Sequence, residues 1–549
     1  MSVKLHFNSQ TCDAAPGSSL FTYAERLGIQ VPTSCNRQGK CKECVVEVTQ
    51  GMDLLSQPGP EERHLKGAFR LSCCTRVKGE QGEVRCHTMR RGTMKIEKHA
   101  FALPVDRRTW QLEPAVTRDG DRILLDGVEI ERSAKPLHGL AIDLGTTTVV
   151  MRILNLDTGE VVADSSFENP QRFGGSDVMA RIQYDTEDRT KTLQRTLVGY
   201  LSRAITEFPV DPRTIYEVVI AGNSTMRDMF FKLSVYSIGQ SPYQSLTELE
   251  FAEGKRTTTS LADTARRLGL PIHPKARIYG LPIISGHVGA DAAACMLAVD
   301  IAHESRVVAV MDIGTNTELI VGNRDKVLAA SCPAGPAFEG GQITFGMPGL
   351  PGAIEKVRID DSGTVHTTVI GDAPPEGLCG SGLVDLMSEL LRTERMNQLG
   401  RFESGTDFVV AETDGHAITF SEADVNALAQ AKGANVAGLQ IAFAEYGIRY
   451  QDLDVFYLAG GFGRHLDLES SKRIGLIPNI PAEKIVQVGN ASVEGACIAL
   501  LSRTKRAELE DLVRRVQHCR LETHPGFFDF FVNGCQFAPV EDAAEGVSG

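Results

Sequence analysis

The sequence predicts a multidomain α/β protein, with a small N-terminal domain and a large domain made of two related halves. The chain has 549 residues, which is too long for a single hydrophobic core. Cysteines gather in residues 35–44, and a strand, turn and strand pattern occurs near residue 143 and again near residue 312. The cysteine cluster indicates the small domain, and the repeat indicates a duplication in the large one.

The composition excludes several classes of function. Hydrophobic residues make up 42% and charged residues 23% of the chain, the balance of a soluble globular protein. A net charge of −13 argues against a nucleic-acid partner, because a phosphate backbone requires basic patches. No apolar run approaches the roughly 20 residues of a membrane helix, and the N-terminus is typical of a strand rather than a signal peptide. We therefore expect a cytoplasmic protein that does not bind membranes, in which clustered thiols favour a metal site over disulfides.

The first 50 residues predict a strand, a helix, a cysteine loop and a second strand. VKLHF, from Val3, alternates as a strand does, and a helix follows with Ser18 or Ser19 as its cap and Gly28 at its end. The loop contains Cys35, Cys41 and Cys44, and CVVEVTQG follows as a strand. Glycine in the loop relieves steric limits where backbone crowds a ligand.

The cysteine spacing favours a 2Fe–2S cluster over structural zinc. Cys35-x5-Cys41-x2-Cys44 has one residue more in its first gap than the plant-type pattern, and 28 residues separate Cys44 from Cys73. Zinc sites usually pair two Cys-x2-Cys units or add histidines, and this chain has one such unit. Incidental core cysteines are the remaining alternative. Cys73 is the expected fourth ligand and Cys74 stays an alternative, because neighbouring residues of an extended chain point to opposite sides.

Together these features resemble the β-grasp ferredoxin domain over residues 1–90. Ferredoxins of that family place the fourth ligand after Leu-x, and Leu71-Ser72-Cys73 matches this arrangement. The resemblance implies a 2Fe–2S cluster held by four ligands, Cys35, Cys41, Cys44 and Cys73.

The repeated motif Asp-x-Gly-Thr-x-Thr predicts two phosphate-binding turns. Each copy lies between apolar strands, and each supplies glycine and threonine for backbone and hydroxyl donors to a phosphate. Asp143 and Asp312 are the candidate catalytic residues, because an aspartate beside phosphate makes sense with Mg²⁺ between them. The expected nucleotide contacts in the two turns are Gly145, Thr146, Thr147, Gly314, Thr315 and Asn316. Two ordinary β-hairpins are the alternative.

A third stretch completes the predicted nucleotide site. DVFYLAGGFG is a buried strand that ends in a turn with Gly460, Gly461 and Gly463. The order of loop, loop and glycine turn resembles the superfamily of acetate and sugar kinases, heat-shock chaperones and actin, with its duplicated ribonuclease-H-like lobes. The resemblance implies ATP between two lobes, and the chain has neither a Walker motif nor a dinucleotide fingerprint.

The motifs divide the chain into five parts. The expected parts are a 2Fe–2S domain (1–90), a charged linker (91–137), a first ATPase lobe (138–305), a second lobe (306–525) and a C-terminal tail (526–549). The glycine-rich stretches 333–352 and 377–382 are either active-site loops or plain connections. Asp291 is a candidate near Mg²⁺, although a helix cap is the simpler interpretation.

A ferredoxin domain fused to an actin-like ATPase resembles the reductive activators of corrinoid proteins. The resemblance is carried by the cysteine loop, Leu71-Ser72-Cys73, both Asp-x-Gly-Thr-x-Thr turns, NPQ-x-x-GGSDVMARI (169–182), GNSTM, CGSGL and AGGFG. It implies an ATP-hydrolysing activator that passes one electron to a Co(II) corrinoid protein of a methyltransferase system, restoring Co(I). A low-potential electron donor is the second implied partner, and a homodimer is the oligomer considered. Asn36-Arg37-Gln38 departs from the family, whose loop is richer in glycine, and this bears on the cluster potential.

Other functions stay open on the sequence alone. One is an activator of another low-potential acceptor, one is a nucleotide-gated redox sensor, and one is a small-molecule kinase. For the kinase no substrate-site base stands out in the sequence.

Overall fold

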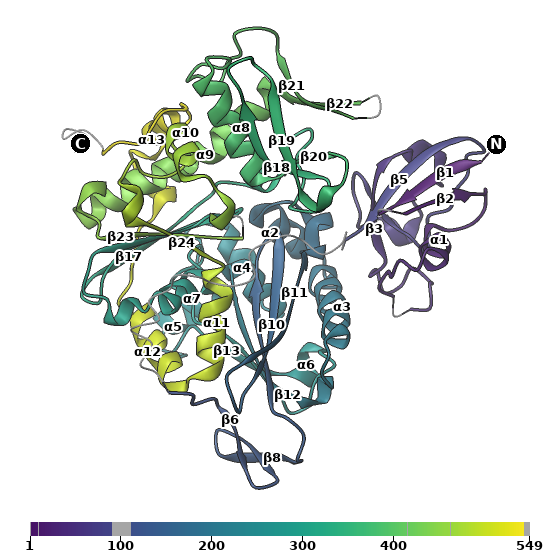
Figure 1. The fold of residues 1–549 in the computed structure, drawn as a ribbon. Coiled ribbons are helices and arrows are strands. Elements are labelled where there is room, and N and C mark those ends of the chain that lie inside the picture. Colours follow the sequence, from purple (N-terminus) through teal and green to yellow (C-terminus); the bar gives the residue numbers. More distant parts are fainter. Residues whose placement is uncertain are drawn as a thin grey trace.

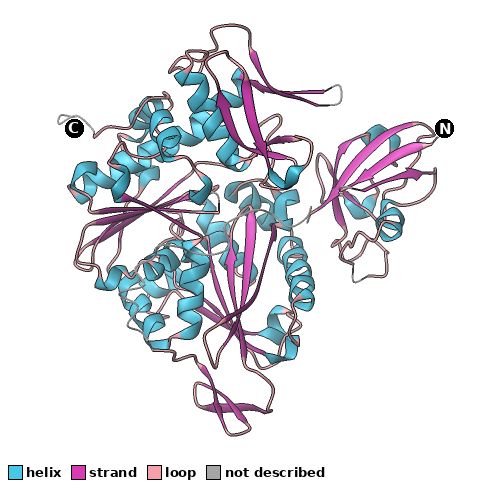
Figure 2. Cartoon of the chain, viewed as in Figure 1, coloured by secondary structure: helices cyan, strands magenta, loops and turns pink. Residues whose placement is uncertain are grey.

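The protein consists of a small domain beside a large two-lobed domain (Figure 1). The computed structural model describes residues 2–8, 10–33, 35–89, 111–413, 416–461 and 463–542. Helices flank the two central sheets of the large domain (Figure 2). Among the described helices, none combines the length and apolar character that a bilayer crossing requires.

The small domain is a mixed sheet with one helix packed into its core. Its strands are in the order β2-β1-β5-β3-β4, with β1 and β5 parallel and the other pairs antiparallel. Ser19 caps helix α1 and Gly28 has the left-handed backbone that follows a helix end, as predicted. The elements are β1 (Val3–Phe7), β2 (Gln10–Ala14), α1 (Leu20–Arg26), β3 (Val45–Gln50), β4 (Phe69–Leu71) and β5 (Gly82–Thr88).

The sheets of the two lobes share a core of five strands with the same topology, and each has a sixth strand at a different edge. In each sheet three consecutive strands form an antiparallel meander, and a later strand adds parallel to the first of them. The first sheet is β11-β10-β9-β12-β14-β13: β9 (His138–Leu144), β10 (Thr148–Asn155), β11 (Val161–Glu168), β12 (Ile215–Gly222), β13 (Leu261–Thr264) and β14 (Arg277–Gly280). The second is β24-β23-β15-β16-β17-β25: β15 (Val308–Asp312), β16 (Thr317–Gly322), β17 (Val327–Cys332), β23 (Val455–Ala459), β24 (Ile485–Gly489) and β25 (Gln517–His518). The duplication predicted from the repeated motif is therefore present in the backbone.

Helices close the space between the two sheets. α11 packs on α7 and on strands β9 and β12, so a late segment of the chain completes the core of the first lobe. The helices of the first half are α2 (Val178–Glu187), α3 (Thr192–Glu207), α4 (Ser224–Phe230), α5 (Leu246–Ala252), α6 (Ala265–Leu268) and α7 (Ala290–Ala298). Those of the second half are α8 (Gly380–Arg392), α9 (Glu422–Tyr446), α10 (Leu468–Ile474), α11 (Ala491–Leu501), α12 (Arg503–Val513) and α13 (Phe527–Gly534).

Several strands lie outside these three sheets. Part of the predicted linker forms an antiparallel sheet of β6 (Val116–Asp119), β7 (Arg122–Leu125) and β8 (Val128–Arg132). The second lobe also carries β18 (Ala353–Ile359), β19 (Val365–Val369) and β20 (Gly377–Leu378), and the hairpin of β21 (Asp407–Thr413) and β22 (His416–Ser421). Helix α13, in the predicted tail, packs on α9. None of these elements is predicted by the local sequence patterns.

Candidate functional site

A cavity between the two lobes brings together the predicted phosphate turns. Asp143 is the last residue but one of β9 and Asp312 is the last residue of β15, so the related strands bring both aspartates to the same place. The predicted residues that line the cavity are Asp143, Gly145, Thr146, Thr147, Asp312, Gly314, Thr315, Asn316, Gly460 and Gly461. Gly463 is not among the lining residues and begins a short 3₁₀ turn behind them.

The two turns are in direct contact through side chains. Thr147 Oγ1 lies 2.7 Å from Thr315 Oγ1. Glu339 accepts hydrogen bonds from both hydroxyls, with Thr147 Oγ1 at 2.8 Å from Glu339 Oε2. Sequence reasoning missed Glu339, because it stands in a glycine-rich stretch without a regular period. Burial raises the pKa of this carboxyl, and the two threonine hydroxyls oppose that rise.

Glycine is required at two positions of the site. A Cβ at Gly145 would lie 2.6 Å from the carbonyl oxygen of Thr148, to which the Gly145 N–H donates at 3.0 Å. Gly460 has φ +109°, and a Cβ there would lie 2.4 Å from the carbonyl oxygen of Ile313. The third glycine turn therefore packs directly against the second phosphate turn.

Asp143 is oriented by residues that are far away in the sequence. Its carboxylate accepts hydrogen bonds from Asn490 Nδ2 and Ser492 Oγ, both at 2.9 Å. Asn490 also caps α11 by accepting the N–H of Val493. Burial raises the pKa of Asp143, and the two hydrogen bonds oppose the rise.

Further carboxyl groups surround these aspartates. Burial, followed by the charge of Asp143, raises the pKa of Asp312 to about 7. Burial, with the charges of Asp143 and Asp312, also raises the pKa of Asp291 to about 7. Asp291 lines the cavity from the first turn of α7. The cap residue of that helix is Gly289, so the simpler interpretation of Asp291 as a helix cap is wrong. Buried carboxylates that repel one another are a fitting environment for a divalent cation, and Mg²⁺ binds through a few carboxylates, water and substrate phosphates.

The glycine-rich stretches left open by the sequence contribute to the cavity wall. Residues of 333–352 and 377–382 that line it are Phe338, Glu339, Met347, Pro348, Gly349, Cys379, Gly380 and Ser381. Met347 packs with Ala353, Ile370 and Cys379 as a small apolar group. An apolar wall next to polar turns suits a ligand with a flat base and a charged phosphate tail.

The four predicted cluster ligands lie together in the small domain as two pairs. Cys44 Sγ is 3.3 Å from Cys73 Sγ. Burial raises the pKa of Cys35, but hydrogen bonds from Cys41 and its neighbours bring the value down to about 7. Two pairs of thiols fit a 2Fe–2S cluster, because four cysteines then serve two irons.

Cys73 fits the fourth position better than Cys74 does. The contact between Cys44 and Cys73 lowers the pKa of Cys73 and raises that of Cys44, so the two buried sulfurs share one thiolate charge between them. Burial and the charge of Cys73 raise the pKa of Cys74 to about 12. Cys74 Sγ lies 3.7 Å from Cys73 Sγ, and Cys74 is the more exposed of the two.

The backbone of the cysteine loop has an unusual conformation. Asn36, Arg37 and Lys42 have positive φ angles of 50°, 65° and 62°, and Gly39 has φ +70°. Left-handed backbone in residues other than glycine costs free energy and clusters at functional sites. The loop thereby wraps around the thiols although it has less glycine than the pattern of the family.

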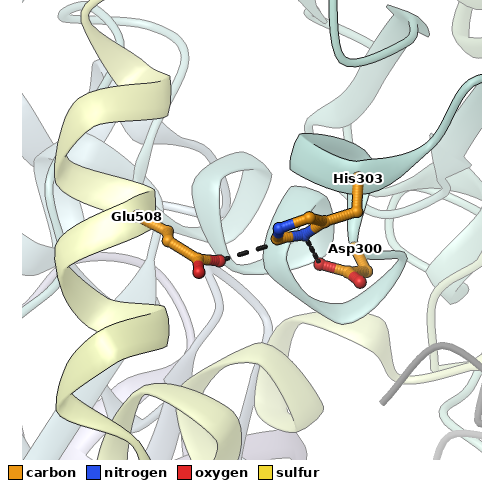
Figure 3. A group of neighbouring side chains, drawn as sticks. All are labelled: Asp300, His303 and Glu508. Atoms are coloured by element: carbon orange, nitrogen blue, oxygen red, sulfur yellow. Dashed lines mark hydrogen bonds and ion pairs between the residues drawn. The ribbon is translucent and has the colours of Figure 1, made fainter. Parts of the chain in front are cut away.

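Another group of possible metal ligands lies outside both the cavity and the cysteine loop. Within the described ranges, Asp300, His303 and Glu508 are the one trio of such side chains with ligand atoms within 4.8 Å of one another (Figure 3). Lys505 Nζ donates to Asp300 at 3.1 Å and to Glu508 at 2.8 Å. The lysine ammonium already supplies the positive charge, so we assign no metal to this group.

The comparisons with known proteins agree with this geometry. Residues 4–78 match a 2Fe-2S iron-sulfur cluster binding domain, residues 138–304 match the RACo middle region, and residues 306–545 match the C-terminal domain of RACo, the ASKHA domain. A "Corrinoid activation enzyme RamQ" from Eubacterium limosum is 32% identical over 447 residues, which are 76% of this chain and 73% of the relative. The chain belongs to the RACo family.

One further relative and one solved structure extend the likeness. A "[Co(II) methylated amine-specific corrinoid protein] reductase" from Methanosarcina barkeri is 24% identical over 421 residues, 72% of this chain and 76% of the relative. The structure of a "Reductive activator for corrinoid,iron-sulfur protein" is 25% identical, covers 98% of both chains and has a TM-score of 0.72. The predicted fold class is confirmed: a ferredoxin domain precedes an ATPase domain of the ASKHA fold. The family domains also support the predicted 2Fe–2S cluster, ATP and Mg²⁺.

Proposed function

We propose that this chain is an ATP-dependent reductive activator that passes one electron from its 2Fe–2S cluster to a Co(II) corrinoid protein and so restores Co(I) for methyl transfer. The observation that carries the proposal is the presence in one chain of two built sites, the paired thiols of the small domain and the cavity between the lobes. The related corrinoid activation enzyme and Co(II) corrinoid protein reductase support the choice of acceptor.

The cavity residues divide into three roles. The N–H groups and hydroxyls of the two threonine turns bind the ATP phosphates. Asp143 and Asp312 hold Mg²⁺, and Asn490 and Ser492 orient Asp143 for that task. Glu339, which contacts both turns, is positioned to accept a proton from the attacking water.

The pairing of the two sites has an energetic reason. The bound cluster supplies a one-electron carrier, and plant-type clusters have potentials near −400 mV. If the cobalt couple lies lower, each 100 mV costs about 2.3 kcal/mol for one electron. A nucleotide-dependent change of shape can offset that cost only if the chain binds the partner differently in the two states. An electron carrier alone would need no ATPase.

Further parts of the proposal concern the surroundings of the protein. A low-potential donor reduces the cluster, and the reaction takes place in the cytoplasm, where the thiols stay reduced. The proposed domains are 1–90, 138–305 and 306–525. The stretches predicted as linker (91–137) and tail (526–549) contain the β6–β8 sheet and helix α13, so both include folded parts. A homodimer is the oligomer to test.

A direct assay distinguishes the proposal from its alternatives. ATP hydrolysis by the iron-loaded full chain should rise at least several-fold when a Co(II) corrinoid protein is added, and the Co(I) absorbance band should appear. Hydrolysis that ignores the corrinoid protein but responds to cluster oxidation would favour a redox sensor. Transfer of the γ-phosphate to an added acid or sugar would favour a kinase.

A further inference from the structure

A short segment connects the first phosphate turn to the small domain. It consists of Asn169, which follows β11, and the 3₁₀ turn η4 (Pro170–Gly174). The segment opens the sequence motif 169–182, whose role the nucleotide site and the cysteine site leave unexplained. Asn169 is fully buried, Phe173 is 5% exposed, and Arg172 reaches the small domain.

The first end of the segment is bonded to the phosphate turn itself. The Asn169 N–H donates to the carbonyl oxygen of Thr147 at 2.6 Å. Its side-chain Nδ2 donates to the carbonyl oxygen of Gly145 at 2.8 Å. A displacement of the peptides of this turn therefore acts directly on Asn169, since both of these contacts are to its backbone.

The segment itself is held rigid between its ends. Asn169 Oδ1 accepts the N–H of Gln171 at 3.0 Å, which fixes the start of the turn. The fully buried Arg181 donates through Nε to the carbonyl oxygen of Gly175 at 3.0 Å, which fixes its end. Because the segment is short and hydrogen-bonded at both ends, we expect it to move as one rigid unit.

The other end contacts the small domain beside the cysteine loop. Arg172 Nη2 lies 3.3 Å from Glu47 on β3, and its Nη1 lies 3.1 Å from Glu168. The rings of Phe173 and His64 pack edge to face with centroids 6.3 Å apart. Glu168 belongs to the first lobe and Glu47 to the small domain, so the Arg172 guanidinium bridges a carboxylate from each.

The same docking brings the cysteine loop onto helix α3. Arg195 Nη2 on α3 donates to the carbonyl oxygen of Cys41 at 3.2 Å. Gly174 of the segment packs on Leu193 of α3, where a Cβ would lie 2.6 Å from Cδ2. The docked position therefore places one side of the ligand loop against the first lobe, next to the segment.

We propose that residues 169–174 are a latch that couples the first phosphate turn to docking of the small domain, and that ATP binding releases this docking. Asn169 senses the turn, and Arg172 and Phe173 hold the small domain. That ATP releases the docking, and does not strengthen it, rests on the proposed function. An electron acceptor has to approach the cysteine loop, and docking covers the Cys41 side of that loop with α3. When the first phosphate turn adjusts to ATP, the contacts of Arg172 and Phe173 with the small domain and the contact of Arg195 with Cys41 then break together.

Hydrogen exchange of the iron-loaded full chain tests the latch without any corrinoid protein. The docking contacts join residues 43–66 of the small domain to residues 170–199 of the first lobe. In the wild type, saturating Mg²⁺ with a non-hydrolysable ATP analogue should speed exchange at least about threefold in both stretches. Asn169→Ala should abolish this response to the analogue. Arg172→Ala should exchange fast with or without the analogue.

Arg122→Ala is the matched control, because Arg122 forms an ion pair with Glu129 at 2.8 Å in the distant β6–β8 sheet. It should behave as the wild type does. If Asn169→Ala fails to fold, Arg172→Ala and Phe173→Ala still test the latch from its other end. Unchanged or slower exchange in the wild type, or a full response in Asn169→Ala, would overturn the proposal. Because the corrinoid protein is absent, such a failure leaves electron delivery to cobalt as a separate question.

Discussion

Thr147 of the first lobe and Thr315 of the second lobe touch, with their hydroxyl oxygens 2.7 Å apart. Aligned on the motif aspartates, Thr315 corresponds to Thr146 and Thr147 to Asn316, so the contact joins neighbouring rather than equivalent positions of the two turns. Glu339 accepts a hydrogen bond from each of the two hydroxyls. The duplicated halves of the chain thus meet at the place where we assign the ATP phosphates. A relative movement of the lobes has to change this contact, so phosphate binding and lobe movement are linked by geometry.

Replacing either threonine should impair hydrolysis more than it impairs folding. Thr147→Val and Thr315→Val keep the shape of the side chain and remove one hydroxyl donor. Loss of a single donor that contacts developing charge lowers kcat by about 100-fold or more. Phosphate release and thermal unfolding should be measured together. Thr186→Val, which removes a hydroxyl bonded to the Ile182 carbonyl outside the cavity, should hydrolyse ATP at the wild-type rate.

Glu339→Gln should retain ATP binding and lose hydrolysis by roughly 10²–10⁴-fold, the usual effect of removing a general base. Burial raises the pKa of Glu339, so in the wild type hydrolysis should fall on acidification at a pH above the ordinary glutamate range. Glu355 also lines the cavity, and Glu355→Gln is the matched control with an expected loss below about tenfold. A Glu339→Gln enzyme with the wild-type rate and pH profile would exclude this residue as the base.

Asp312 should make stability depend on pH in the nucleotide-free protein. Its pKa is raised from 3.8 to about 7 by burial and by the charge of Asp143. Below pH 3.8 the carboxyl is protonated in both the folded and the unfolded protein, so its burial carries no charge penalty. As pH rises from 3.8 through 7 the unfolded protein ionises first, and the stability of the folded protein falls. Asp312→Asn should therefore unfold roughly 2–4 °C above the wild type at pH 8 and close to it at pH 4.5. Calorimetry at the two pH values checks this, and an equal difference at both would contradict it.

Much of the nucleotide site was predictable because its turns are local motifs. The spacing of Asp143 and Asp312 from their glycines and threonines is set within six residues, and the strand on each side is apolar. Asn490 and Ser492 could not be assigned to Asp143, because they reach it only after α11 crosses to the first lobe. Glu339 was missed for a similar reason: its role depends on two hydroxyls from different lobes.

The predicted ends of the domains show where local patterns are insufficient. The charged stretch 117–136 suggested a linker, yet its turn-rich sequence folds as the β6–β8 sheet. Val116 and Ile123 are buried there, so a few apolar positions outweighed the many charges. Gly463 was expected to touch the nucleotide because it belongs to a glycine run. In the fold it turns away from the cavity and donates its N–H to the carbonyl oxygen of Gly460 at 3.2 Å.

Neighbouring cysteines allow a matched test of the cluster assignment. Cys73→Ser should lose the cluster, because Cys73 pairs with Cys44, whereas Cys74→Ser should keep two irons and two sulfides per chain. Iron, sulfide and zinc contents of protein purified without oxygen give the answer, and ATP binding serves as the control for folding. Stoichiometric zinc in the wild type, or a cluster that survives Cys73→Ser and is lost in Cys74→Ser, would contradict the assignment.

ATP should be required to deliver the electron to cobalt and should not be required to reduce the cluster. The most direct measurement mixes pre-reduced protein with a Co(II) corrinoid protein and follows the Co(I) absorbance band with and without Mg²⁺-ATP. With Mg²⁺-ATP, Co(I) should form as the cluster is oxidised. Without nucleotide, or in Asp143→Ala, the cluster should stay reduced and cobalt should stay Co(II). Formation of Co(I) at the same rate without nucleotide would contradict the account.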